Sequence, residues 1–63
     1  LNANAYWVFR VKSLIQAKLG DFAGAVETAK IGKVKAQEGK NDQYVKYNED
    51  SIKEWSKKLK IKK

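Results

Sequence analysis

The sequence predicts an all-α fold, in which an antiparallel helical hairpin is followed by a third, C-terminal helix that caps it. Apolar residues recur at spacings of three and four, the period of an amphipathic helix. The chain has no Pro, and two of its four glycines stand where helices would end. We therefore expect one three-helix unit over residues 1–63, with helices at about 3–19, 22–38 and 43–60.

Two turns separate the three helices. Gly20 follows an apolar stretch and precedes Asp21, which suits a glycine just past one helix and an aspartate that caps the next. The segment from Gly39 repeats this order with a longer loop, in which Asn41 or Asp42 can cap the third helix. Short connections of this kind place consecutive helices antiparallel.

The first helix carries a broad apolar stripe, which we expect to be its core face. The stripe consists of Trp7, Val8, Val11, Leu14, Ile15 and Leu19. At about 100° per residue, a second set lies near the opposite side, where a helix with one wet face would carry charges. Its members are Tyr6, Phe9, Ser13 and Ala17. Because this set has no obvious partner within three helices, it is the predicted interaction surface, with scattered surface residues as the alternative.

The second helix has an inner face of small residues, namely Ala25, Ala29, Gly32 and Ala36. Small side chains let a neighbouring helix approach closely, so we expect the stripe of the first helix to nest against them. A mid-helix glycine destabilises a helix by about 1 kcal/mol relative to alanine, which indicates that Gly32 serves packing. A second, weaker strip is expected to receive the third helix, and it consists of Gly24, Thr28 and Ile31.

The third helix is one-sided. Its apolar side consists of Tyr44, Tyr47, Asn48, Ser51, Ile52, Trp55 and Leu59, and its opposite side of Lys46, Glu49, Asp50, Lys53, Lys57 and Lys60. Basic amphipathic helices also occur at membrane surfaces, but here the apolar side is needed to cover the core. We therefore expect no membrane contact.

Composition narrows the chemistry. A chain of 63 residues buries only about 60% of the surface that its unfolded form exposes, and domains of this size usually add disulfides, a metal or a partner. With no Cys and no His, the chain has no thiolate or imidazole metal ligand and no Ser-His or Cys-His pair. We expect no enzyme activity and no catalytic, cofactor or metal site. Protein is the expected partner.

The charge leaves one alternative open. The formal net charge is +7, from 14 Lys and Arg against 7 Asp and Glu, which invites a basic nucleic-acid-binding module that uses the lysine-rich third helix. Five lysines lie in a C-terminal tail: Lys57, Lys58, Lys60, Lys62 and Lys63. The aromatic residues of the third helix lie on its apolar side, whereas a stacking platform needs exposed rings beside basic groups. We expect salt-dependent nucleic-acid binding without specificity.

The hairpin resembles a tetratricopeptide repeat over about half of the chain. The resemblance rests on the turn Leu19-Gly20-Asp21-Phe22, with Phe22 at the aromatic place and Ser13, Ala25 and Gly32 at small places. The sequence departs from the repeat because Lys12 stands where a leucine is usual, Gln16 replaces an aromatic residue, and no proline follows the second helix.

Two stretches, 6–21 and 48–56, are also similar to the C-terminal helical segment of an uncharacterised bacterial family, mostly from Bacteroidetes. Proteins of that family have a β-rich domain upstream and no established activity. The resemblance implies that the chain is the C-terminal segment of a longer, exported protein of the periplasm or cell envelope. The residues themselves leave its localisation open.

These observations predict a non-catalytic helical module for protein–protein interaction or assembly. Self-association into a homo-oligomer is the specific expectation, and packing on a preceding domain of a longer chain is the other arrangement of the same kind. The alternative from a different class is the basic nucleic-acid-binding module.

Overall fold

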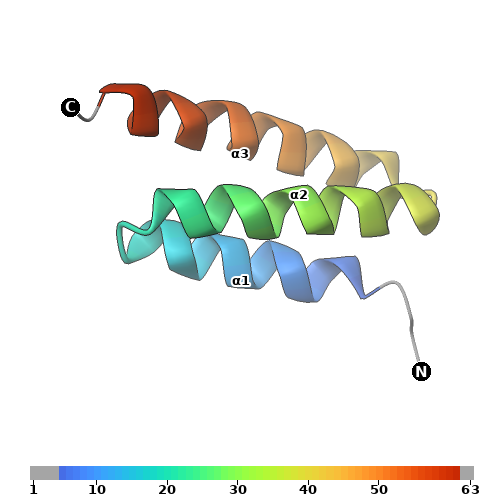
Figure 1. The fold of residues 1–63 in the computed structure, drawn as a ribbon. Coiled ribbons are helices and arrows are strands. Elements are labelled where there is room, and N and C mark those ends of the chain that lie inside the picture. The colour runs from blue at the N-terminus through green and yellow to red at the C-terminus, as the bar shows by residue number, and fades with distance from the viewer. Residues whose placement is uncertain (1–4, 62–63) are drawn as a thin grey trace.

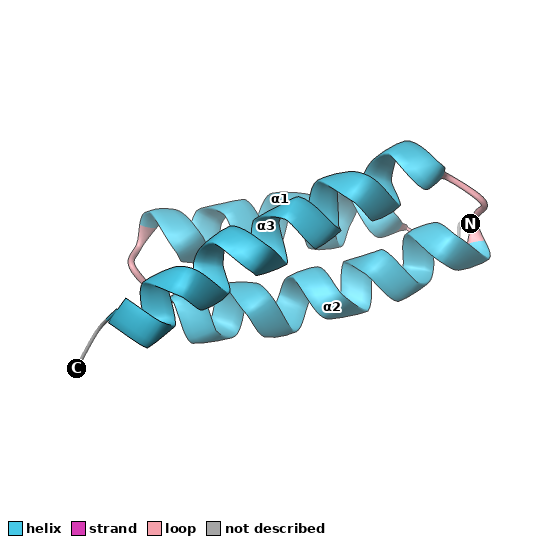
Figure 2. Cartoon of the chain, turned by 90° about the horizontal axis from the view of Figure 1, so that it is seen from above, coloured by secondary structure: helices cyan, strands magenta, loops and turns pink. Residues whose placement is uncertain are grey.

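The computed structural model describes residues 5–61 and contains three helices, α1 (Tyr6–Lys18), α2 (Phe22–Glu38) and α3 (Asp42–Ile61). The predicted all-α class, a hairpin followed by a third helix, is confirmed. Figure 1 shows α2 lying between α1 and α3 with alternating chain direction. In Figure 2, seen from above, α1 and α3 overlap while α2 is set to one side, so α2 packs against both neighbours. The predicted start of the first helix at residue 3 lies outside the described residues.

The first turn is built as predicted. Gly20 adopts the left-handed conformation (φ +87°) that ends a helix, and the N–H groups of Gly20 and Asp21 donate to Ala17 and Gln16 at 3.0 and 2.9 Å. The Asp21 carboxylate then accepts a hydrogen bond from the N–H of Gly24 at 3.0 Å, which caps α2.

The second turn differs from the expected arrangement at one residue. Gly39 has an ordinary φ of −82°, and Lys40 takes the left-handed position with φ 59°. Gly39 has a different role, because a Cβ at this position would lie 3.1 Å from Cε2 of Tyr6. The predicted cap is confirmed for Asn41, whose Oδ1 accepts from the N–H of Tyr44 at 3.2 Å.

The small face of α2 forms the centre of the unit, as predicted. Ala25, Ala29 and Ala36 are fully buried. A Cβ on Gly32 would lie 3.0 Å from Cβ of Phe9 in α1 and 3.4 Å from Nδ2 of Asn48 in α3. The absence of a side chain at Gly32 therefore lets both neighbouring helices approach the α2 backbone. Trp55 of α3 is 6% exposed and fills the space beside Ala25, Val26 and Ala29.

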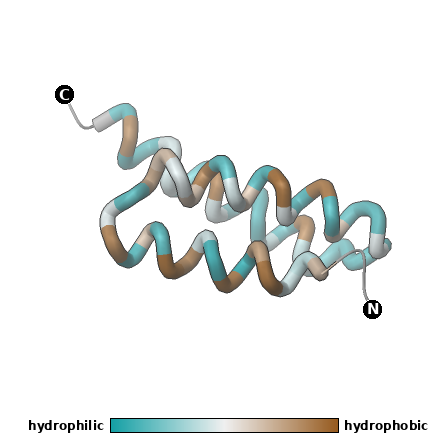
Figure 3. The backbone as a smooth tube through the Cα atoms, turned by 60° about the horizontal axis from the view of Figure 1, so that its bottom comes forward, coloured by the Kyte–Doolittle hydropathy of each residue, from teal (hydrophilic) through white to brown (hydrophobic). Residues whose placement is uncertain are grey.

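The predicted core face of α1 is wrong. The six apolar side chains are 41–80% exposed in the folded unit: Trp7 41%, Val8 52%, Val11 54%, Leu14 44%, Ile15 54% and Leu19 80%. Figure 3 shows hydrophobic segments recurring along α1. The side of α1 that packs on α2 is instead the one with Phe9 and the fully buried Ser13.

The second strip of α2 also faces a different neighbour from the one expected. Thr28 is buried against α1, where its hydroxyl donates to Oε1 of Gln16 at 2.6 Å, and Ile31 is 46% exposed. The predicted apolar side of α3 is confirmed for Asn48, Ser51 and Trp55, which are buried, but Tyr47 and Leu59 of the same set are 41% and 39% exposed. The side chains predicted for its wet side are all exposed: Lys46, Glu49, Asp50, Lys53, Lys57 and Lys60.

Candidate protein-interaction face

The apolar side of α1 points away from α2 and is exposed. We call it the outer face of α1, and it consists of Trp7, Val8, Val11, Leu14, Ile15 and Leu19. Four of these side chains, together with Lys12 and Gln16, line a shallow cleft of about 440 Å³. Single exposed apolar residues are normal on a protein surface, whereas large contiguous apolar patches are typical of interaction sites.

The amino end of this face is held in position by the fold. The Trp7 ring meets the Tyr6 ring edge to face, with centroids 5.1 Å apart. The Tyr6 hydroxyl accepts a hydrogen bond from Nδ2 of Asn41 at 2.9 Å, and its ring stacks edge-on against Tyr44 at 4.9 Å. Trp7 is therefore held in place by a series of aromatic contacts that reaches α3. This ordering reduces the entropy cost of fixing the Trp7 side chain in a complex.

The matching side of α3 is exposed like the outer face of α1, but it is not apolar. When Ser13 of α1 is aligned with Asn48 of α3, both fully buried against α2, the two helices have nearly the same sequence of buried and exposed positions. The positions of α3 that match the outer face are Asp42, Gln43, Lys46, Glu49, Asp50 and Glu54, and all six are exposed. Every one is polar or charged, whereas every counterpart in α1 is apolar.

The four residues predicted to form the interaction surface lie inside the unit, so that placement is corrected. Tyr6 packs on α3, Phe9 lies against Gly32, and Ala17 packs on the cluster around Trp55. Ser13 is fully buried, and its hydroxyl donates to the carbonyl of Arg10 at 2.8 Å.

Polar bonding explains why α1 uses this side. Besides the bond from Thr28 to Gln16, Nη1 of Arg10 donates to Oγ of Ser51 at 2.7 Å and to the carbonyl of Tyr47 at 3.3 Å. Turning the apolar stripe inward would break these bonds and would place large side chains where Gly32 requires close approach. The small residues Ser13 and Ala17, four positions apart, are the sequence signal that could have identified this side, because small side chains permit close packing.

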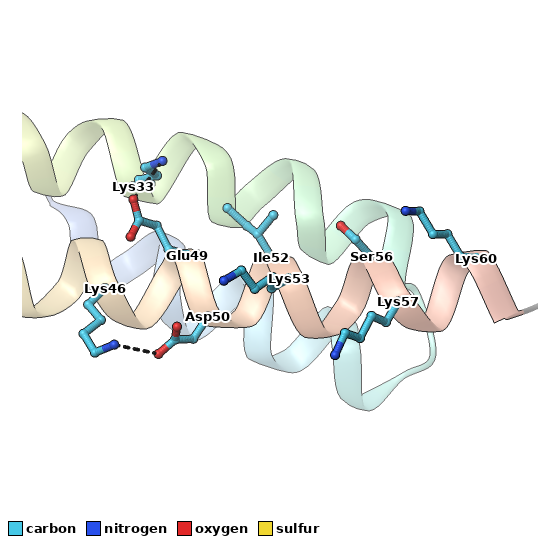
Figure 4. Close-up of a pocket in the computed structure, with 9 residues that line it drawn as sticks. All are labelled: Lys33, Lys46, Glu49, Asp50, Ile52, Lys53, Ser56, Lys57 and Lys60. Carbon is cyan, nitrogen blue, oxygen red and sulfur yellow. Dashed lines mark ion pairs between the residues drawn. The ribbon is translucent and has the colours of Figure 1, made fainter.

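A second, basic groove lies between α2 and α3 (Figure 4). It is lined by Lys33, Lys46, Glu49, Asp50, Ile52, Lys53, Ser56, Lys57 and Lys60. Nζ of Lys33 lies 3.1 Å from Glu49, and Nζ of Lys46 lies 3.6 Å from Asp50, so part of the positive charge is paired. No aromatic ring lines the groove, which leaves it without the stacking surface typical of single-strand binding.

Two further classes of site are absent from residues 5–61. That segment contains no group of three or more acidic, His or Cys side chains arranged to hold a metal ion. None of its helices is both long enough and apolar enough to span a bilayer. The candidate functional surfaces of the described residues are the outer face of α1 and the basic groove.

No family model matches the sequence, and no curated protein or solved structure matches it. The resemblances to a tetratricopeptide repeat and to the bacterial family stay predictions.

Proposed function

We propose that this chain is a non-catalytic protein-interaction module, which assembles by burying the outer face of α1 against a helix of another protein segment. The observation that carries the proposal is the contrast between α1 and α3. Two helices with matching burial patterns differ at the six matched outer positions, apolar in α1 and polar or charged in α3. Polar and charged residues, as in α3, are typical of a helix side that faces water, whereas apolar residues, as in α1, are typical of a side that is covered.

The strength of such a contact can be estimated. Full burial of one Val, Leu or Ile side chain contributes about 1.5–3 kcal/mol, and the outer-face side chains are about half exposed before binding. Covering all six then contributes on the order of 4–9 kcal/mol. Association itself opposes binding by about 4 kcal/mol or more, so this face supports a weak, reversible complex unless other contacts add to it.

Two arrangements of the expected kind use this face. A second copy of the chain could cover it in a homo-oligomer, and a preceding domain of a longer chain could cover it as helices do in stacked repeats. The tetratricopeptide-like hairpin favours helix-on-helix packing in either case.

The test uses an amphipathic peptide as the probe. A peptide of about 20 residues, with a Leu and Ala stripe and uncharged Gln and Ser elsewhere, is long enough to form a helix on docking. Calorimetric titration is expected to detect binding to the 63-residue chain and to the double variant K46Q/D50Q, but not to V11Q/I15Q. The two variants carry polar substitutions at matched exposed positions of α3 and α1, and neither changes the net charge.

Sedimentation equilibrium at two concentrations completes the test, since self-association through the same face would also be lost in V11Q/I15Q. A chain that stays monomeric and binds no peptide would refute the proposal. Equal binding by both double variants would also refute it, because the contact would then lie elsewhere.

The alternative is a basic nucleic-acid-binding module, and the groove of Figure 4 is the observation that favours it. Titration with single- and double-stranded DNA at two salt concentrations tests this function. Weak binding that falls steeply with salt would reflect net charge alone, whereas a tight, sequence-dependent complex would favour the alternative.

A further inference from the structure

We propose that the partner of the outer face of α1 is an amphipathic helix with acidic residues beside its apolar stripe, and not a second copy of this chain. This inference rests on the proposed function and deepens it by naming the chemistry of the partner. It follows from the charges around the outer face, which are all of one sign within α1.

The charged side chains of α1 are Arg10, Lys12 and Lys18, and the helix contains no Asp or Glu. At about 100° per residue, Arg10 lies beside Leu14 on one border of the face and Lys12 lies on the other border. Lys18 continues the line of Leu14 and Val11 at the carboxyl end. A helix docked on the apolar stripe therefore meets a basic group on each side and at one end.

The border next to α3 is also basic on balance. A separate groove at this border, between α1 and α3, has four charged residues in its lining: Arg10, Lys18, Lys58 and a single acid, Glu54. Arg10 is fixed by its hydrogen bonds to Ser51 and Tyr47, so its guanidinium stays at this border. A carboxylate on a docking helix would meet cations that are already positioned, which favours an acidic partner.

A second copy of the chain would bring the wrong charges. In a two-fold contact the same surface meets itself, so the basic borders of one α1 would face the basic borders of the other. Each copy also carries a formal net charge of +7. Like charges across an interface disfavour the pairing and are a common means of excluding wrong partners.

A head-to-tail contact between copies would cover the outer face less completely. The exposed side of α2 carries Glu27 and Glu38, but its large apolar side chains are only Ile31 and Val34. The acidic residues of the unit that match the outer face lie on α3, as Asp42, Glu49, Asp50 and Glu54. That side of α3 has no apolar stripe, since Gln43 and Lys46 occupy its other matching positions. It can supply charge to α1 but cannot bury the apolar side chains.

The test compares two peptides with the same Leu and Ala stripe as the uncharged probe, one with Glu and one with Lys at the flanking positions. Calorimetric titration of the 63-residue chain is expected to give an affinity about tenfold higher for the Glu peptide at about 50 mM salt. The ratio is expected to shrink at about 500 mM salt, where exposed charges are screened.

Two substitutions in α1 and one matched control in α3 make the test specific to α1. Lys18→Glu is expected to lower the affinity for the Glu peptide by about threefold or more and to raise that for the Lys peptide. Lys53→Glu changes the net charge equally at the matching exposed position of α3, and we expect it to leave the ratio nearly unchanged. Lys12→Glu is a second variant in case Lys18→Glu disturbs the end of α1, and far-UV circular dichroism verifies the fold of each.

Equal affinity for the two peptides, or a preference for the Lys peptide, would overturn the inference. So would a dimer that V11Q/I15Q dissociates and that the Glu peptide fails to displace. In either case binding of the uncharged peptide would leave the proposed function standing, so the two failures can be told apart.

Discussion

Replacing Gly32 by Ala tests how closely α1 and α3 approach α2. At an exposed position within a helix, alanine is more favourable than glycine by about 0.8–1.0 kcal/mol. At Gly32 the new Cβ would lie 3.0 Å from Cβ of Phe9 and 3.4 Å from Nδ2 of Asn48. The Phe9 atom is attached directly to the α1 backbone, so α1 itself has to move, and overpacking of a core typically destabilises by about 1–3 kcal/mol.

The helix preference for alanine stabilises the variant and the overpacking against α1 destabilises it, and the overpacking is the larger effect. We expect Gly32→Ala to lower the free energy of unfolding by about 1 kcal/mol, which corresponds to a fall in Tm of about 4–8 °C for a domain of this size. The assay is thermal and urea unfolding followed by far-UV circular dichroism.

The control measures the intrinsic preference in the same helix. Lys30 is exposed on α2, and a comparison of Lys30→Ala with Lys30→Gly should favour alanine by about 1 kcal/mol. We expect the change from glycine to alanine to raise the free energy of unfolding at position 30 and to lower it at position 32. If Gly32→Ala instead raised Tm as the change at position 30 does, close approach would not be the reason for the glycine.

Three further predictions concern the turns and the side of α1 that is buried. Lys40→Gly should raise stability by about 0.5–1 kcal/mol because φ is 59°, whereas Gly20→Ala should lower it by about 1 kcal/mol, and chemical unfolding measures both. Asp21→Ala should lower stability by about 1 kcal/mol through loss of the cap of α2, and an unchanged urea midpoint would contradict that role. Leu14→Gln should lower stability by about 1 kcal/mol or less, because nearly half of the side chain is exposed, while Ser13→Leu should lower it by about 1–3 kcal/mol. The reverse order would mean that α1 packs by its apolar stripe.

The helix boundaries and the small face of α2 could be predicted because their causes are local. Gly20, Asp21 and Asn41 act on backbone groups a few residues away, and their chemistry is readable in order along the chain. The alanines of α2 and Gly32 indicate close approach whichever neighbour comes near.

The orientation of α1 could not be predicted from its own apolar residues. Hydrophobic periodicity identifies the side of a helix that avoids water, but it does not distinguish the core of the unit from a contact with something else. The interactions that fix the orientation of α1 involve the other helices. They are the hydrogen bonds of Gln16 with Thr28 and of Arg10 with Ser51, and the contact of Phe9 with Gly32. The candidate site was missed for this reason, because the stripe that forms it was assigned to the interior.

Under the proposed function, the position of the apolar stripe separates folding from recognition in this chain. Val11 and Ile15 contribute little to the packing among the three helices, since about half of each side chain is already in water. Substitutions along this side of α1 can therefore change which partner is bound while the arrangement of the helices is kept. The same scaffold can acquire a new specificity without first acquiring a new core.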